Sequence, residues 1–271
     1  MGKGHRSSKP KNQPVIQQGN LIKVQNREQG TKPSVLAGFL ITLGMWVLLS
    51  WILDRPIVPT PWVVARVLWH DLVSGNLILN AGASLARVLI GCLLSVLIGL
   101  PMGLVAGRTG FGKRFVLPTV YFLYPIPKIA FLPVLLVLFG LGEGSKLVLI
   151  TLVIVFQMVI PVADQVQRIS PDLFLAARFM GLQGAKLYYH LIIPAVLPTV
   201  VSSLKLAGGI GFSVLFFAEN YATRYGLGAL VMNAWIMADY VGMYAGIVTL
   251  GVLGIGLFFV LDRLGETVIK G

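Results

Sequence analysis

Long apolar runs separated by short polar segments make up most of this chain. A helix that crosses a bilayer needs roughly 20 mostly apolar residues. Six runs approach or exceed that length, at residues 33–53, 78–107, 115–141, 147–163, 191–218 and 241–261. None of the segments between them is long enough for a second folded domain. The pattern therefore predicts an all-α, polytopic membrane domain of six spans over residues 35–271, preceded by a polar tail over residues 1–34.

Small residues recur at every fourth position of the second predicted span. They are Gly91, Ser95, Gly99, Gly103 and Gly107. Residues four apart share one helical face, and a face of small side chains lets a second helix approach closely. This ladder predicts tight helix packing and requires no catalytic role.

The third predicted span contains four prolines, namely Pro118, Pro125, Pro127 and Pro133. Proline removes a backbone donor and kinks or breaks a helix. Broken backbone is tolerated in a membrane only where protein or a water-filled cavity covers it. The span therefore lines a pathway or is a kink buried against its neighbours, and both alternatives stay open.

Charge is scarce and unevenly distributed. Only 12% of residues are charged, against about 25% in ordinary soluble domains, so an integral membrane protein is indicated. The net charge is +12, and six of these charges come from the tail over residues 1–34. Contact of this tail with RNA or lipid headgroups is one interpretation. A disordered cytoplasmic leader that contacts membrane lipid at most, with no nucleic-acid partner, is the simpler one.

The positive-inside rule gives the orientation. With the N-terminus inside, fifteen of the 22 Lys and Arg residues fall in cytoplasmic segments, four outside and three within spans. Both termini are therefore expected in the cytoplasm of a bacterial inner membrane.

Enzyme chemistry finds little support in the sequence. The three histidines are scattered, the ten acids form no pair at catalytic spacing, and the single cysteine, Cys92, excludes an internal disulfide. The stretch 107–114, GRTGFGKR, is close to a P-loop, but Arg114 replaces the hydroxyl that would hold magnesium. It also follows a membrane helix and not a strand. We therefore expect no catalytic residue, cofactor or metal in this chain.

Ionisable side chains inside membrane spans are costly and often functional. Arg87 can snorkel or pair across helices, and Glu219 ends the fifth predicted span. Candidates for a transport pathway are Lys128, Lys205, Glu219 and Asn220. The two lysines are central in their spans and would suit an anionic solute. A secondary transporter or channel, acting without an ATPase, would use the same groups and is the alternative interpretation.

The predicted cytoplasmic loop over residues 164–190 has a helical pattern of its own. Ser170-Pro171-Asp172 is typical of a helix start, with an N-cap serine, proline at the first position and an acid in the first turn. Leu173, Ala176, Ala177 and Met180 follow at helical spacing, Gly181 can end the helix, and a second short helix is expected near 183–189. The small Ala-Ala pair predicts a ridge that enters a groove on another protein.

This loop resembles a known family. Ala176-Ala177-x3-Gly181-x9-Leu191-Ile192-Ile193-Pro194 is similar to the EAA loop of ATP-binding-cassette (ABC) importer permeases, E-A-A-x3-G-x9-I-x-L-P. Leu175 stands where that pattern has Glu, and Leu191 where it has Ile. Further stretches resemble the nitrate/sulfonate/taurine subgroup: VPTPW at 58–62, SLARVLIG at 84–91, PKIAFLP at 127–133, FGLGEGSK at 139–146, and Ala218-Glu219 with GLG at 226–228.

The resemblance implies a MetI-like permease fold and an assembly in which separate subunits form the pore, hydrolyse ATP and deliver the solute. Two permease copies, expected to be a homodimer, would form the pore, and two separate ABC ATPase subunits would bind ATP and magnesium. A periplasmic or lipid-anchored binding protein would deliver a small, anionic, nitrate-, sulfonate- or taurine-like solute. The loop would supply the coupling helix, with contacts to the ATPase expected from Asp172, Leu173, Ala176, Ala177, Arg178, Met180, Gly181 and Gly184.

Overall fold

The computed structural model describes residues 35–221 and 223–270, and it is helical with connecting turns. The predicted tail, 1–34, lies outside the described residues. Backbone contacts divide the chain into two units, 1–52 and 53–271. In the first unit, α2 (Val35–Leu53) is a continuous apolar helix with most of its side chains exposed, as expected of a helix surrounded by lipid. It accounts for nearly all of the first predicted span.

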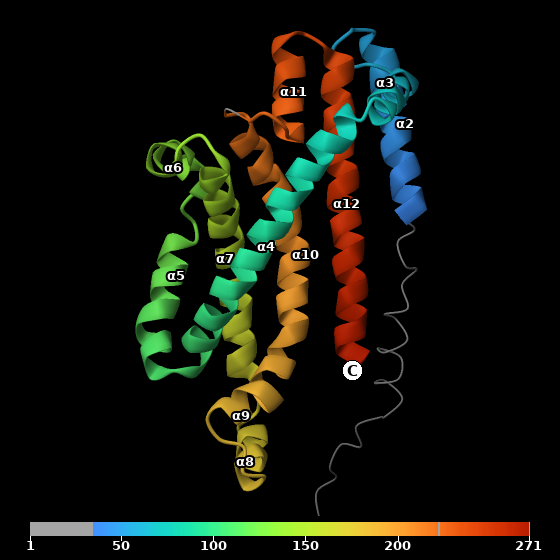
Figure 1. Cartoon of the computed structure of the whole chain (residues 1–271). Helices are drawn as coiled ribbons and strands as arrows, with labels where there is room; N and C mark the ends of the chain where they lie inside the picture. The colour runs from blue at the N-terminus through green and yellow to red at the C-terminus, as the bar shows by residue number, and fades with distance from the viewer. Residues whose placement is uncertain (1–34, 222, 271) are drawn as a thin grey trace, which may run out of the picture. The chain divides into compact units, whose positions relative to one another are not determined.

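The second unit contains the remaining helices (Figure 1). They are α3 (Pro61–Val73), α4 (Asn76–Arg108), α5 (Leu117–Leu123), α6 (Leu132–Phe139), α7 (Glu143–Arg168), α8 (Pro171–Phe179), α9 (Ala185–Leu187), α10 (Ile193–Glu219), α11 (Leu227–Ile236) and α12 (Tyr240–Lys270). Single turns of π-helix at Gly112–Val116 and Tyr188–Ile192, and a 3₁₀ turn at Lys128–Phe131, join some of them.

The six predicted spans are recovered in the described residues. Five helical runs are long and apolar enough to cross a membrane, and a bent pair of shorter helices passes the same test when its two halves are counted as one span. The fourth span is longer than predicted, because α7 continues through polar residues at both ends to cover Glu143–Arg168. The sequence pattern did not indicate α3 and α11, since their 13 and 10 residues are too few to cross a bilayer.

The glycine ladder is the contact between α4 and α7, as predicted. A Cβ atom on Gly103 would lie 2.7 Å from Val162 Cβ, and one on Gly107 would lie 2.5 Å from the Ala163 carbonyl oxygen. Between these glycines and Gly91, Ser95 Oγ donates across the contact to the Thr151 carbonyl oxygen at 3.1 Å. Any larger side chain on this face would therefore force the two helices apart.

The proline-rich span is broken, as predicted. Its two halves, Gly112–Leu123 and Lys128–Phe139, meet at an angle of 83°. Pro125 and Pro127 lie in the break, where neither can donate a backbone hydrogen bond. The Lys128 ammonium donates to the carbonyl oxygens of Leu123, at 2.9 Å, and Tyr124, so that it caps the end of α5.

The apolar core lies where α4, α7, α10 and α12 pack together. Val88, Ile154 and Leu215 have no exposed surface there, and Gly208 of α10 allows close approach of Leu257 of α12. Many other large apolar side chains stay exposed along the outer faces of these helices. This distribution is typical of helices whose outer faces contact lipid tails.

Candidate functional site: the α8 loop and the buried polar groups

The start and the end of α8 are fixed by local hydrogen bonds, as the sequence predicts. The Asp172 backbone N–H donates to Ser170 Oγ at 3.2 Å, with Pro171 at the first helical position. At the other end the Gly181 and Leu182 N–H groups donate to the Arg178 and Ala177 carbonyl oxygens, at 3.0 and 2.9 Å. This pair of bonds is the Schellman motif, and it requires the positive φ of Gly181, +75°.

The surface of α8 differs from the predicted Ala-Ala ridge. Ala177 is only 2% exposed, because it packs inside its own chain against Val166, Leu187 and Ile192. Its small side chain lets α8 approach the ends of α7 and α10. Ala176 on the adjacent position remains exposed.

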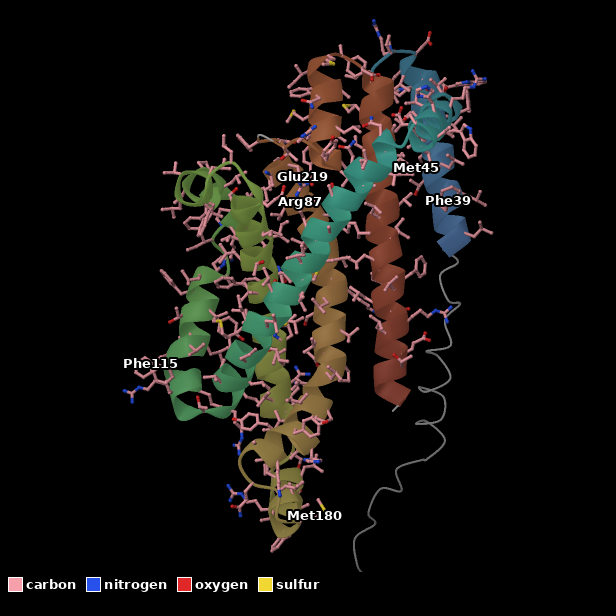
Figure 2. The ribbon with its side chains drawn as sticks, viewed as in Figure 1. Phe39, Met45, Arg87, Phe115, Met180 and Glu219 are labelled. Carbon is pink, nitrogen blue, oxygen red and sulfur yellow. The ribbon has the colours of Figure 1, made fainter. Side chains whose placement is uncertain are left out.

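Large apolar side chains are exposed on the rest of α8. Leu173, Leu175, Phe179 and Met180 are 52%, 54%, 83% and 70% exposed, and Met180 lies at the tip of the unit in Figure 2. Large apolar side chains exposed on a short polar loop are typical of a protein-binding site. The exposed surface of α8 is therefore built from these larger residues and Ala176, and Ala177 is buried beneath it.

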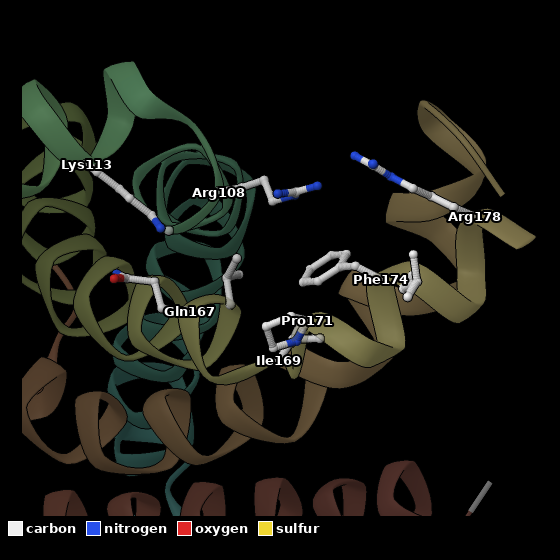
Figure 3. A pocket seen from close by; sticks show the side chains of 10 residues that line it. Arg108, Lys113, Gln167, Ile169, Pro171, Phe174 and Arg178 are labelled. Carbon is white, nitrogen blue, oxygen red and sulfur yellow. The ribbon is translucent and has the colours of Figure 1, made fainter.

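A basic cavity of about 310 Å³ lies between α8 and the ends of α4 and α7 (Figure 3). Arg108, Lys113 and Arg178 contribute positive charge to it, and the described residues that line it include no carboxylate. The Arg108 guanidinium lies 4.5 Å from the centre of the Phe174 ring, a cation–π contact that holds it over α8. A neighbouring cavity shares Arg108 and Arg178 and is lined also by Gly184, whose φ is +55°.

Arg87 pairs across helices, one of the two alternatives that the sequence left open. Its guanidinium donates through Nε and Nη2 to the Glu143 carboxylate of α7, at 2.6 and 2.7 Å. Nη1 donates to Glu219 Oε1 of α10 at 2.5 Å and to the Tyr225 carbonyl oxygen at 2.8 Å. Arg87 is 7% exposed, so these contacts join three helices inside the protein (Figure 2).

Glu219 has no exposed surface, and both of its carboxylate oxygens accept hydrogen bonds. Besides Arg87, it accepts from Ser84 Oγ at 2.9 Å and from the Gly228 N–H at 2.8 Å. Asn220, with its amide oriented to donate, bonds to the carbonyl oxygens of Phe216 and Gly228 at 3.0 and 3.1 Å. Both residues hold the end of α10 to the start of α11, and their proposed place in a pathway stays a prediction.

The sequence interpretation missed two partners in this polar cluster, Ser84 and Asn80. Asn80 Oδ1 accepts from the Gly226 N–H and Ser84 Oγ from the Leu227 N–H, both at 2.8 Å. A signal for them exists, because Asn80, Ser84 and Arg87 recur at i, i+4 and i+7 in an otherwise apolar helix.

The two intramembrane lysines have different surroundings. Lys205 Nζ lies 2.5 Å from Asp262 Oδ1 of α12 and 5.2 Å from the Phe258 ring centre. Lys128 caps α5 and borders a cavity of about 330 Å³ at the break of the bent span. The assignment of both lysines to a pathway stays a prediction.

Membrane-length helices joined to a capped, exposed helix between α7 and α10 define a polytopic membrane protein. No group of three or more potential metal-ligating side chains occurs in residues 35–221 and 223–270. Residues 95–270 match the family described as "Binding-protein-dependent transport system inner membrane component", and the chain belongs to this family.

Relatives agree with this assignment. An ABC transporter permease protein of Brucella melitensis is 30% identical over 84% of this chain and 91% of its own length. The taurine transport system permease protein TauC of Escherichia coli is 31% identical over 64% of this chain and 63% of its own length.

A solved structure shares the fold. It is titled as an inward-facing conformation of the MetNI methionine ABC transporter and superposes with a TM-score of 0.59. The match covers 73% of this chain and 98% of that one, with 21% identical residues.

The chain is thus a multi-pass inner-membrane permease of an ABC importer, working with a separate ATPase and a binding protein. The alternative of a secondary transporter or channel is set aside. So is the P-loop interpretation of residues 107–114, which include the end of α4 and the first residues of the π-helix Gly112–Val116.

Proposed function

We propose that this permease imports a small anion with a sulfonate-like or nitrate-like group. Relatives are named as permeases for taurine, for aliphatic sulfonates and for nitrate, which all carry an oxyanion group. Cationic side chains within the helical bundle are compatible with such a solute, because an isolated anion in a membrane is costly without a partner. The binding protein, periplasmic or lipid-anchored, would deliver it.

The proposed orientation has both termini in the cytoplasm. Fifteen of the 22 basic residues then lie inside, as the positive-inside rule requires. Arg108 and Lys113, together with Arg178 from much later in the chain, line one cavity at the α8 end of the bundle. The α12 helix runs toward that same end of its unit (Figure 1). These observations support α8 as a cytoplasmic element.

In this proposal α8 is the coupling helix that docks on an ATPase subunit, where ATP and magnesium bind. The observation that carries the proposal is a short helix capped at both ends that exposes Leu173, Phe179 and Met180 between two membrane helices. Leu175 cannot supply the charge of the motif glutamate, so we expect Arg178 and Arg108 to meet acidic side chains of the partner. Closure of the ATPases would then move α8, and with it α7 and α10, as rigid bodies.

A second, identical permease copy completes the proposed assembly. The cavities beside Lys128 and Ser202 lie on the faces of apolar membrane helices. Polar groups there would contact lipid tails unless protein or water covers them. A second copy that packs over this face would enclose them.

Cysteine cross-linking tests the coupling role. The chain has one cysteine, Cys92, which is buried. Met180→Cys, in the complex co-expressed with its ATPase and binding protein, is expected to cross-link to the ATPase through a short reagent that joins a thiol to an amine. Leu97→Cys on α4 is the matched control, because Leu97 is 62% exposed but lies in the middle of a span. Absence of a cross-link from Met180→Cys, or an equal yield from both, would refute the proposal.

Transport gives the functional readout. Gly181→Trp introduces a bulky side chain at φ +75° and is expected to abolish uptake and solute-stimulated ATP hydrolysis while the complex stays in the membrane. Solute-stimulated hydrolysis at the wild-type rate in this variant would contradict coupling through α8.

A further inference from the structure

A cavity of about 330 Å³ lies at the break of the bent span. The break itself, α7 and α10 line it, and its polar side chains are Tyr124, Lys128, Gln157 and Ser213. Tyr124 Oη donates to Gln157 Oε1 at 3.2 Å across the cavity. Apolar walls such as Phe156 and Phe217 surround these groups. The arrangement, a mostly apolar hollow with a few convergent polar groups, is typical of small-molecule sites.

Lys128 supplies a positive charge to this cavity that no carboxylate in the described part of the chain neutralises. Of the three cations in the predicted spans, Arg87 and Lys205 form ion pairs with Glu143, Glu219 and Asp262. An ammonium group has three donors, and Lys128 uses two on backbone carbonyls. Its nitrogen also lies 4.4 Å from the centre of the Phe156 ring, a cation–π contact. One donor and the positive charge thus remain for a ligand.

A second cavity, also about 330 Å³, continues from the first along the same two helices. Gln157 lines both cavities, and the second adds the hydroxyl groups of Thr199, Ser202 and Ser203. Ser202 and Ser213 are eleven residues apart on α10, or about 17 Å at 1.5 Å per residue. That is more than half of a hydrocarbon core of about 30 Å. The described residues that line either cavity include no acid.

We propose that Lys128, Gln157 and Ser213 form an oxyanion-binding site in the membrane, and that the hydroxyl groups of the second cavity continue it into a translocation track. The ligand is a small monoanion of the sulfonate or nitrate type, since one cation and several neutral donors match a single delocalised charge. This inference rests on the proposed function and assigns the permease its own solute contact, in addition to recognition by the binding protein.

Charge-selective labelling tests the site directly. Ser213→Cys places a thiol in the cavity, and buried Cys92 gives little background. In the reconstituted complex, a sulfonate-bearing methanethiosulfonate is expected to react with this thiol about tenfold faster than its trimethylammonium analogue, corrected for their intrinsic rates. Adding Lys128→Met should remove this preference, and an alkanesulfonate or nitrate should protect the thiol. Gly251→Cys on an exposed face of α12, where a Cβ meets nothing within 4 Å, is expected to react with neither reagent.

Each outcome supports or overturns the inference. Equal rates for the two reagents, or a preference unchanged by Lys128→Met, would overturn the oxyanion site. If Ser213→Cys fails to assemble, Ser202→Cys in the second cavity provides the same comparison. A reaction of Gly251→Cys equal to that of Ser213→Cys would also overturn it, because the track would then be no more accessible than a lipid-facing surface.

Uptake separates this inference from the proposed function. Lys128→Met is expected to lower uptake about tenfold, and Lys128→Arg, which keeps the positive charge, should restore much of it. Wild-type uptake in the Lys128→Met variant would refute the site but leave the proposed function intact. If the wild-type complex imports no oxyanion, the proposed function itself fails.

Discussion

Replacing Arg87 with methionine is expected to destabilise the permease more than any exposed change. Methionine keeps most of the length of the side chain but removes the charge and every donor. Glu219, which has no exposed surface, would then keep only Ser84 and the Gly228 N–H as partners. Removing one member of a buried ion pair costs about 3–5 kcal/mol, because the remaining charge is neither solvated nor paired.

The effect can be measured as the melting temperature of the complex in lipid nanodiscs. For domains of roughly this size, 1 kcal/mol corresponds to about 2–4 °C, so a decrease of about 6–20 °C is expected. Glu143→Gln is the control, because it removes the charge of the other carboxylate that accepts from the Arg87 guanidinium. The Glu143 side chain is 58% exposed and can be hydrated, so its loss should cost no more than about 1 kcal/mol.

A double variant tests the cause. In Arg87→Met/Glu219→Gln the buried charge is gone, and the glutamine carbonyl can still accept from the Gly228 N–H. At least half of the lost melting temperature should therefore return. Equal melting of the single and double variants, or a loss in Arg87→Met no larger than in Glu143→Gln, would refute the reasoning.

Two further predictions concern helix packing and capping. Gly107→Ala is expected to cost about 1–3 kcal/mol, since its Cβ would lie 2.5 Å from the Ala163 carbonyl oxygen, whereas Gly82→Ala on the same helix meets nothing within 4 Å and should be nearly neutral. Similar melting temperatures for the two variants would contradict the ladder contact. Ser170→Ala should remove about 1 kcal/mol from α8 and accelerate amide hydrogen exchange over 171–179 about fivefold, and Ser170→Thr should restore protection. Unchanged exchange in Ser170→Ala would mean that the cap is dispensable.

The sequence by itself determined the features that depend on neighbours along the chain. The positions of the spans follow from the apolar runs, the close-packing face of α4 from small residues at every fourth position, and the bend from Pro125 and Pro127. The caps of α8 follow from Ser170 and Gly181. Each rests on an interaction within about four residues, or on a periodicity that one helix displays alone.

Only the tertiary structure decided which charges have partners. Arg87 meets Glu143 and Glu219 from 56 and 132 positions away, and Lys205 meets Asp262 from 57. Lys128 forms no ion pair within the described residues and lines the cavity at the break of the bent span. The tertiary structure also decided that Ala177 is buried against its own chain while its neighbour Ala176 stays exposed. Helical spacing sorts residues into faces, but the face that becomes buried, and what it meets, depends on how separate helices pack.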